Sequence, residues 1–212
     1  MDINRFKKTP LMGILRGIDP SVIEPLIEVL VPSGLESLEI TMNTPQAADI
    51  IKTAVKVSGN RMMIGAGTVT GMESMKKALD AGAGYIVMPT LVNEVTEYCR
   101  ENKIPVFPGA FTPQEIFNAW KAGATMVKVF PARFCGPDYI KEVKGPFDDI
   151  EIMACGGINA DNILEYFSKG ASAVAFGGSV FNNQLLEEGK YSAIADEIRL
   201  YIQLFRKSAK SN

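Results

Sequence analysis

The sequence predicts a (β/α)8 barrel, the TIM-barrel fold. It predicts a single domain over residues 1–212 that includes a short N-terminal helix. Two observations predict the barrel. Short apolar runs rich in Val and Ile alternate with amphipathic segments, and eight such runs occur in 212 residues. Parallel strands buried on both faces read as nearly continuous apolar runs, and a compact barrel of this kind needs about 200 residues.

The predicted strands follow one another at regular intervals. They are Leu11–Arg16, Leu35–Met42, Met62–Val69, Tyr85–Thr90, Pro105–Thr112, Met126–Ala132, Glu151–Ile158 and Ala173–Ser179. Residues 1–9 precede the first run and are expected to form a short helix or cap. No linker, low-complexity stretch or block of charge interrupts the series, which is the reason for predicting one domain.

Helix boundaries also recur. An N-cap residue followed by proline predicts helix starts at Asp19, Thr44 and Thr112, and Asn159 stands in a similar position before the seventh helix. Before four of the strands a glycine can close the preceding helix in the left-handed conformation. These glycines are Gly34, Gly82, Gly123 and Gly170.

A doubly wound open sheet is the structural alternative to the barrel. The turn after the first strand, Gly17-Ile18-Asp19, lacks the glycine-rich dinucleotide fingerprint of that fold. The barrel is therefore preferred.

Composition excludes several function classes. The net charge is −2 and the pI is near 5.4, so no basic field favours nucleic acid or an anionic membrane. No run matches a membrane helix or a signal peptide. The three cysteines are unclustered, which suits a reducing cytoplasm. Without a histidine, imidazole bases and imidazole metal sites are absent, and we expect neither a metal nor a cofactor.

Two charges stand inside apolar strands. Glu39 lies in "SLEIT" on the second run and Lys128 in "VKVFP" on the sixth, on opposite sides of a ring of eight. Three interpretations are open: a self-satisfied buried ion pair, a lysine facing the helix layer, or a catalytic pair. In the third, burial lowers the pKa of the lysine and makes it a nucleophile for carbonyl carbon, with Glu39 as the base.

Further candidates lie at other strand ends, where barrel enzymes carry their active sites. Glycine pairs after the last two strands predict a phosphate site formed by bare backbone N–H groups, although glycine can also serve only a tight turn. Arg16 can hold a carboxylate or phosphate, or be a surface residue. Thr68 can donate a hydroxyl, with Gly65 and Gly67 admitting a ligand, or simply be a strand residue. The glycine-pair candidates are Gly156, Gly157, Gly177 and Gly178, followed by Ser179.

The motifs "LEITMNTP", "IGAGTV", "VMPTL", "PGAFTPQE", "VKVFPA" and "GGI", in this order between Leu11 and Ser179, resemble one family. It is that of the 2-keto-3-deoxy-6-phosphogluconate (KDPG) and 4-hydroxy-2-oxoglutarate (KHG) aldolases. The resemblance implies a cytoplasmic, metal-independent barrel lyase, usually a homotrimer, acting on a small 2-keto-3-deoxy acid.

Matched by motif, the resemblance assigns roles to five residues. It implies that Lys128 forms a Schiff base and that Glu39 moves protons. It further implies that Thr68 contacts the pyruvate carboxylate, that Pro89 lies beside the pyruvyl group, and that Arg16 is an active-site arginine.

Two positions depart from the family pattern. Asn43 stands where many members have a substrate-binding arginine, and Cys155 where threonine is usual and contributes to stereoselectivity. The epimer preference and the need for phosphate therefore stay open. The expected reactions are cleavage of KDPG to pyruvate and glyceraldehyde 3-phosphate, and of KHG to pyruvate and glyoxylate.

Three alternatives remain to this assignment. The first is an aldolase of the 2-keto-3-deoxy-6-phosphogalactonate (KDPGal) type. The second is a phosphate-binding barrel isomerase or synthase in which no covalent lysine adduct forms. The third is a binding module that keeps the phosphate loops without chemistry.

Overall fold

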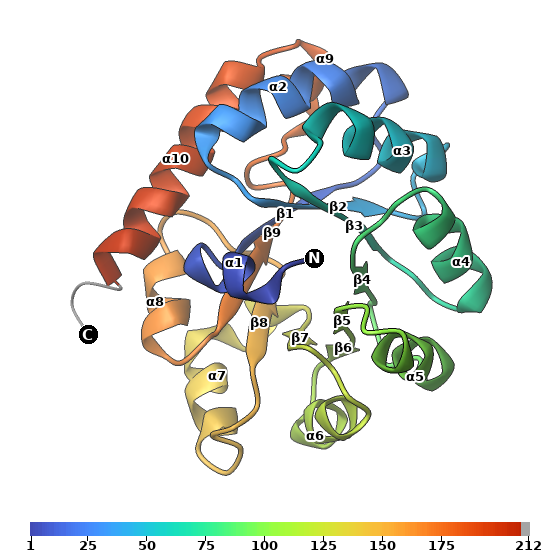
Figure 1. The fold of residues 1–212 in the computed structure, drawn as a ribbon. Coiled ribbons are helices and arrows are strands. Elements are labelled where there is room, and N and C mark those ends of the chain that lie inside the picture. The colour runs from blue at the N-terminus through green and yellow to red at the C-terminus, as the bar shows by residue number, and fades with distance from the viewer. Residues whose placement is uncertain (209–212) are drawn as a thin grey trace.

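The computed structural model describes residues 1–208; the last four residues of the predicted domain lie outside the described part. Within those residues, parallel strands form one nine-stranded sheet in the order β5-β4-β3-β2-β1-β9-β8-β7-β6, curled into a barrel (Figure 1). The strands are β1 (Leu11–Leu15), β2 (Ser37–Thr41), β3 (Met63–Gly67), β4 (Ile86–Val87), β5 (Val106–Phe107), β6 (Gly109–Ala110), β7 (Val127–Val129), β8 (Ile152–Cys155) and β9 (Ala173–Phe176). The predicted TIM-barrel fold is confirmed.

The sequence pattern predicted eight strands, whereas the described chain contains nine. The extra strand arises because Pro108 interrupts the fifth apolar run, and proline has no N–H to donate to a ladder. β5 pairs with β4 through Val106, and β6 pairs with β7 through Gly109. This single run therefore joins the two ends of the sheet.

Helices surround the barrel, most of them in a ring (Figure 1). They are α1 (Ile3–Lys8), α2 (Ile23–Ser33), α3 (Ala47–Ser58), α4 (Met72–Asp80), α5 (Asn93–Glu101), α6 (Pro113–Lys121), α7 (Gly136–Lys144), α8 (Ile163–Ser168), α9 (Asn183–Glu187) and α10 (Tyr191–Ser208), with 3-10 turns η1 (Pro20–Val22) and η2 (Ala132–Phe134). The last helix, α10, packs against α2 and α8. None of the helices described is long and apolar enough to cross a membrane.

The predicted helix signals were correct at most positions. Thr112 caps α6 in a reciprocal box with Glu115, and Asp19 caps η1, which leads into α2. The predicted helix start at Thr44 was wrong, because α3 begins only at Ala47. The Thr44 hydroxyl is engaged elsewhere, because it accepts a hydrogen bond from the Gly17 backbone N–H at 2.9 Å.

Helix ends agree with the prediction. Gly34, Gly82, Gly123 and Gly170 have φ between 91° and 101°, the left-handed region that favours glycine. The predicted start at Asn159 is only partly right. Its Oδ1 accepts backbone bonds from Asp161 and Asn162, but this closes a turn, and α8 begins at Ile163.

The core has two layers. One lies between the sheet and the helices. The other fills the barrel itself and includes Phe6, Met12, Met63, Tyr85 and Phe107. This interior layer is apolar up to the level of Tyr85, whose hydroxyl accepts a hydrogen bond from Ser37 at 2.9 Å.

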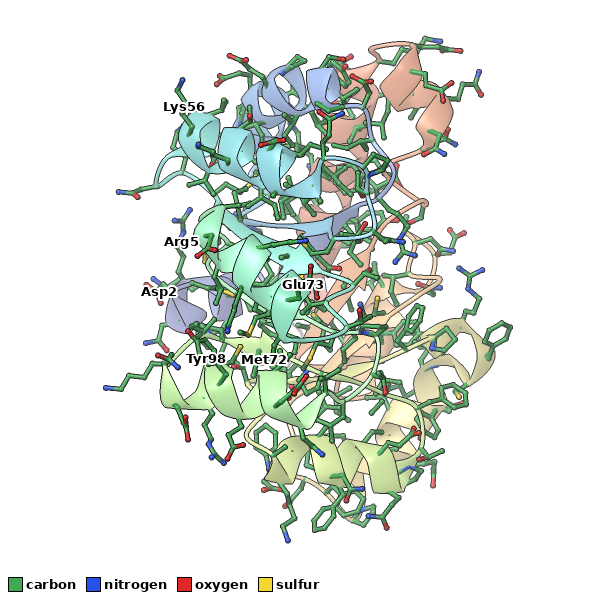
Figure 2. All side chains as sticks on the ribbon, turned by 90° about the vertical axis from the view of Figure 1, so that its right-hand side faces the viewer. Asp2, Arg5, Lys56, Met72, Glu73 and Tyr98 are labelled. Atoms are coloured by element: carbon green, nitrogen blue, oxygen red, sulfur yellow. The ribbon has the colours of Figure 1, made fainter. Side chains whose placement is uncertain are left out.

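Helix α1 covers one end of the barrel (Figure 1). Figure 2 shows it with Asp2 and Arg5 at that end. Arg5 donates to Glu36 at 2.6 Å and to the carbonyls of Asn60 and Arg61, which lie in the segments that lead into β2 and β3. The N-terminal ends of the strands are therefore closed, and a site must open at their C-terminal ends.

Candidate active site

Glu39 and Lys128 both lie inside the barrel, near the C-terminal ends of β2 and β7. Their exposed fractions are 1% and 5%. Each contributes to the electrostatic environment of the other, so the two charges face the same interior space. Lys128 therefore points into the barrel and not toward the helix layer.

The Glu39 side chain fills a space that exists because the neighbouring strand β3 has a glycine, Gly67, at this point. A Cβ built on Gly67 would lie 1.5 Å from Oε1 of Glu39. Gly65 likewise leaves space for the Tyr85 ring, since a Cβ at position 65 would lie 2.3 Å from that ring. The expectation that these glycines admit a ligand is thus corrected: they admit two buried side chains of the protein itself.

The Glu39 carboxylate is buried without a hydrogen-bond partner among the described residues. Burial raises the pKa of this carboxyl, and the positive charges of Lys128 and Arg16 oppose that rise without cancelling it. A carboxylate that lacks partners and has a raised pKa accepts a proton more readily than an exposed carboxylate does.

The pKa of the Lys128 amine is shifted in the direction opposite to the one predicted. Burial lowers its pKa, but attraction to Cys155 and Glu39 outweighs burial, and the pKa lies above its ordinary value. The sequence had predicted a pKa lowered by burial, and this was wrong because it ignored the neighbours. The resting amine is therefore an ammonium, which must lose a proton before it can attack a carbonyl.

Two more side chains lie next to the Lys128 amine. The Cys155 thiol, buried on β8, hydrogen-bonds with Lys128, and burial raises the pKa of that thiol. The ring of Phe130 lies 5.3 Å from Nζ. These contacts hold the ammonium at the base of a cavity.

The cavity has a volume of about 780 Å³ and opens at the C-terminal ends of β7, β8, β9 and β1. This size suits a small organic ligand. The predicted residues in its lining are Arg16, Lys128, Cys155, Gly156, Gly157, Gly177, Gly178 and Ser179. The structure thus brings most of the predicted site together in one place.

The remaining predicted residues lie outside that lining. Glu39 is buried inside the barrel. Thr68 is half-buried with φ at 53°, a strained conformation for a β-branched residue, and its Oγ1 lies 3.4 Å from Nη2 of Arg16. Pro89 is half-buried, and its carbonyl oxygen would lie 2.2 Å from a Cβ on Gly109. Asn43 is exposed and is not brought to the cavity.

The lining also contains residues that sequence reasoning did not assign to the site, among them Phe130, Arg133 and Asn183. For the first two a signal was available. "VKVFPARF" continues past the end of β7 into η2, and residues directly after a barrel strand belong to the face that carries the active site. Asn183 lies in α9, which sequence spacing alone did not place.

A parallel barrel closed at one end, with a buried amine and carboxylate below an open cavity, defines an enzyme of the TIM-barrel class. Comparison with known proteins is more specific. The model of one family, KDPG and KHG aldolase, matches residues 3–196. The chain belongs to this family, and it is a lyase.

Three relatives illustrate the similarity. The 2-dehydro-3-deoxy-6-phosphogalactonate aldolase of Escherichia coli (strain K12) is 31% identical over 205 residues, covering 96% of this chain and 98% of the relative. A solved structure described as native KDPGal has a TM-score of 0.88 at 30% identity, covering 96% of this chain and 97% of the other. KDPG aldolase from Legionella pneumophila, solved with pyruvate captured as a covalent carbinolamine, has a TM-score of 0.85 at 25% identity, covering 93% and 95%.

Proposed function

We propose that the protein is a Schiff-base-forming aldolase that cleaves a phosphorylated 2-keto-3-deoxy sugar acid to pyruvate and glyceraldehyde 3-phosphate. One observation carries the proposal: the amine of Lys128 lies at the base of the cavity, with the unpartnered Glu39 carboxylate facing the same interior. An amine that can reach a bound ketone is the nucleophile that imine chemistry requires.

The first step begins from the ammonium. Transfer of its proton to Glu39, directly or through water, leaves a neutral amine that attacks C2 of the substrate. Glu39 then returns this proton to the hydroxyl of the carbinolamine, which leaves as water and gives an iminium. The raised pKa of Glu39 favours the first of these transfers, because such a carboxylate accepts a proton more readily than an exposed one.

The iminium then acts as an electron sink. Glu39, again ionised, takes the proton of the C4 hydroxyl. The C3–C4 bond breaks, its electron pair forms the enamine of pyruvate, and C4 leaves as the aldehyde. Protonation of the enamine at C3 and hydrolysis of the iminium release pyruvate and restore Lys128.

The remaining site residues divide between the two halves of the substrate. We assign the carboxylate of the pyruvyl half to Arg16 and Thr68, supported by the 3.4 Å distance between Arg16 Nη2 and Thr68 Oγ1. We assign the phosphate to the glycine loops and Ser179. Gly156 and Gly157 have positive φ and so serve the turn as well, but Gly178 has neither a positive φ nor any atom within 4 Å of its Cβ position. Its missing side chain keeps the cavity open.

The relatives include a 2-dehydro-3-deoxy-6-phosphogalactonate aldolase and a KDPG aldolase, so both the gluconate and the galactonate epimers are proposed substrates. Cleavage of KHG to pyruvate and glyoxylate is the proposed second reaction, because KHG shares the 2-keto-4-hydroxy acid unit on which the mechanism acts.

Trapping of the imine tests this function. The protein is incubated with pyruvate and borohydride, and the modified peptide is mapped by mass spectrometry. A reduced pyruvyl adduct on Lys128, absent from a folded Lys128→Met variant, is the expected result. Turnover without any adduct would replace the proposal by a barrel isomerase or synthase. An absence of both adduct and turnover would leave a binding module.

The homotrimer and the cytoplasmic location stay predictions. Large aromatic side chains are exposed on the side of the barrel formed by η2 and α6, with Phe134 at 77% and Phe111 and Phe117 at 37%. Exposed aromatic residues of this kind favour contact with another chain. Light scattering of the purified protein determines whether three copies associate.

A further inference from the structure

Arg133 lies directly beyond the strand that carries Lys128. Its backbone N–H donates to the Gly156 carbonyl at 2.9 Å, which fixes η2 against the loop after β8. A Cβ on Gly157 would lie 2.6 Å from Cβ and 3.4 Å from Nε of Arg133. The stem of the arginine therefore lies on the bare backbone of Gly157, and its side chain lines the cavity.

The guanidinium of Arg133 has no partner among the residues that the structure describes. Across residues 1–208 neither a hydrogen bond nor an ion pair involves its side chain, although eight ion pairs occur elsewhere. The side chain is exposed and held at its base, so it is available to a ligand. Arginine pairs with phosphate through a planar fork of N–H donors.

Charges in the cavity point to a ligand with more than one anionic group. Its lining contains three cations, Arg16, Lys128 and Arg133, and no carboxylate among the residues described. Glu39, buried inside the barrel, interacts with Lys128 and Arg16 and offsets part of this charge. A monoanionic keto acid leaves this excess of positive charge incompletely balanced.

The substrate has an anionic group at each end, and each end lies near a different cation. The carboxylate is bonded to the carbon that Lys128 attacks, so it must lie near that amine, within reach of Arg16. Arg133 follows the end of β7 and lines the cavity together with Gly177, Gly178 and Ser179. It is therefore placed for the opposite end of the substrate.

We propose that Arg133 is a specificity-determining residue that binds the phosphate of the aldehyde half and makes the protein select phosphorylated substrates. The proposal rests on the function proposed above. It adds a side chain that the sequence motifs did not indicate, and it assigns phosphate selection to that residue rather than to the glycine loops alone.

Kinetics with matched variants test the proposal. Arg133→Gln removes the charge, Arg133→Lys keeps a point charge without the fork, and Lys141→Gln removes one exposed charge on α7 outside the cavity as the control. Each is assayed with KDPG, with its unphosphorylated analogue 2-keto-3-deoxygluconate, and with KHG.

Arg133→Gln should raise KM for KDPG by about tenfold or more with a smaller effect on kcat, because a charge-assisted pair to a phosphate is lost. Turnover of 2-keto-3-deoxygluconate should stay within about twofold, and Arg133→Lys should be intermediate. Equal losses with both sugar acids, or no loss with KDPG, would overturn the proposal. A similar loss with KHG would overturn the assignment to phosphate in favour of any second anion.

Two further readouts separate this proposal from the aldolase proposal. Pyruvate trapping on Lys128 should be unchanged in Arg133→Gln, since pyruvate has no phosphate. Calorimetric titration with glycerol 3-phosphate needs no turnover, and binding should weaken in Arg133→Gln but not in Lys141→Gln. If wild-type protein traps no pyruvate, the aldolase proposal fails, while this titration still decides whether Arg133 binds phosphate; equal binding by the two variants would reject it.

Discussion

Gly67 on β3 leaves the space that the carboxylate of Glu39 on β2 fills, since any Cβ at position 67 would lie 1.5 Å from Oε1. The glutamate is thus oriented by shape and not by hydrogen bonds, because neither of its oxygens has a partner among the residues described. Such an arrangement leaves the carboxylate free to exchange protons while its position stays fixed.

Gly67→Ala should therefore displace Glu39. We expect turnover to fall by at least about tenfold and stability to fall by about 1–3 kcal/mol, the usual cost of overpacking a core. Steady-state kinetics and urea unfolding measure the two effects. Gly71→Ala is the control, since its backbone is extended and nothing lies within 4 Å of its Cβ position. If both variants behave like wild type, the glycine does not position the glutamate.

Glu39→Gln keeps the shape of the side chain and removes its charge. Loss of a general base costs about 10²–10⁴ in rate, so kcat should fall within that range. The pKa of Lys128 should fall as well, because Glu39 is one of the groups that raise it. Borohydride trapping of pyruvate should therefore persist in this variant but proceed more slowly, because the ammonium loses its proton without Glu39 as the acceptor. Loss of trapping together with turnover would mean that Glu39 is needed to form the imine.

The pH dependence of kcat/KM should reflect the same carboxyl. Glu39 acts as a base only when ionised, and burial raises its pKa from the ordinary value of about 4.3. Activity should therefore fall as the pH drops through that raised pKa, at a higher pH than for an exposed glutamate. The raised pKa of Lys128 acts in the same direction, because neutral amine increases as the pH rises. A pH–rate profile without this acid limb would contradict the assignment.

Cys155 should affect the choice between epimers. Its thiol lines the cavity beside Lys128, close to where the carbon chain of the substrate must pass. Cys155→Thr adds a methyl group and a stronger hydrogen-bonding group there, and we expect the ratio of kcat/KM for KDPG and KDPGal to change by about tenfold. Cys135→Ser, at a half-buried position outside the cavity lining, should leave the ratio unchanged. An unchanged ratio in Cys155→Thr would place epimer selection elsewhere.

The barrel could be predicted because its signals are local. The glycines that close helices and the apolar runs follow from backbone conformation and burial, which act over a few residues. The fifth run was predicted as one strand, whereas the segments on either side of Pro108 pair with two different strands, β4 and β7. The helix start at Thr44 was mispredicted because its hydroxyl bonds to Gly17, which is distant in sequence.

In the site, residue types could be predicted but their environments could not. Lys128 and Glu39 were found because charges are unusual in buried strands. The pKa direction of Lys128 depends on Cys155, which comes from another strand, and the access of Arg133 to the cavity depends on the backbone at Gly157. Both are contacts between segments distant in sequence, which spacing alone does not reveal.

Helix α1 should contribute to the stability of the whole barrel and not only cover its end. Phe6 is fully buried and meets the Phe107 ring edge-on at a centroid distance of 6.2 Å, inside the barrel. Removal of a buried phenylalanine side chain costs about 3–5 kcal/mol, so Phe6→Ala should lower the free energy of unfolding by that amount. Lys8→Ala, an exposed change on the same helix, should cost less than about 0.5 kcal/mol. Because the cavity lies at the opposite end of the barrel, the folded fraction of Phe6→Ala should keep the wild-type KM. A Phe6→Ala variant as stable as Lys8→Ala would show that α1 covers the end of the barrel without contributing to the stability of the core.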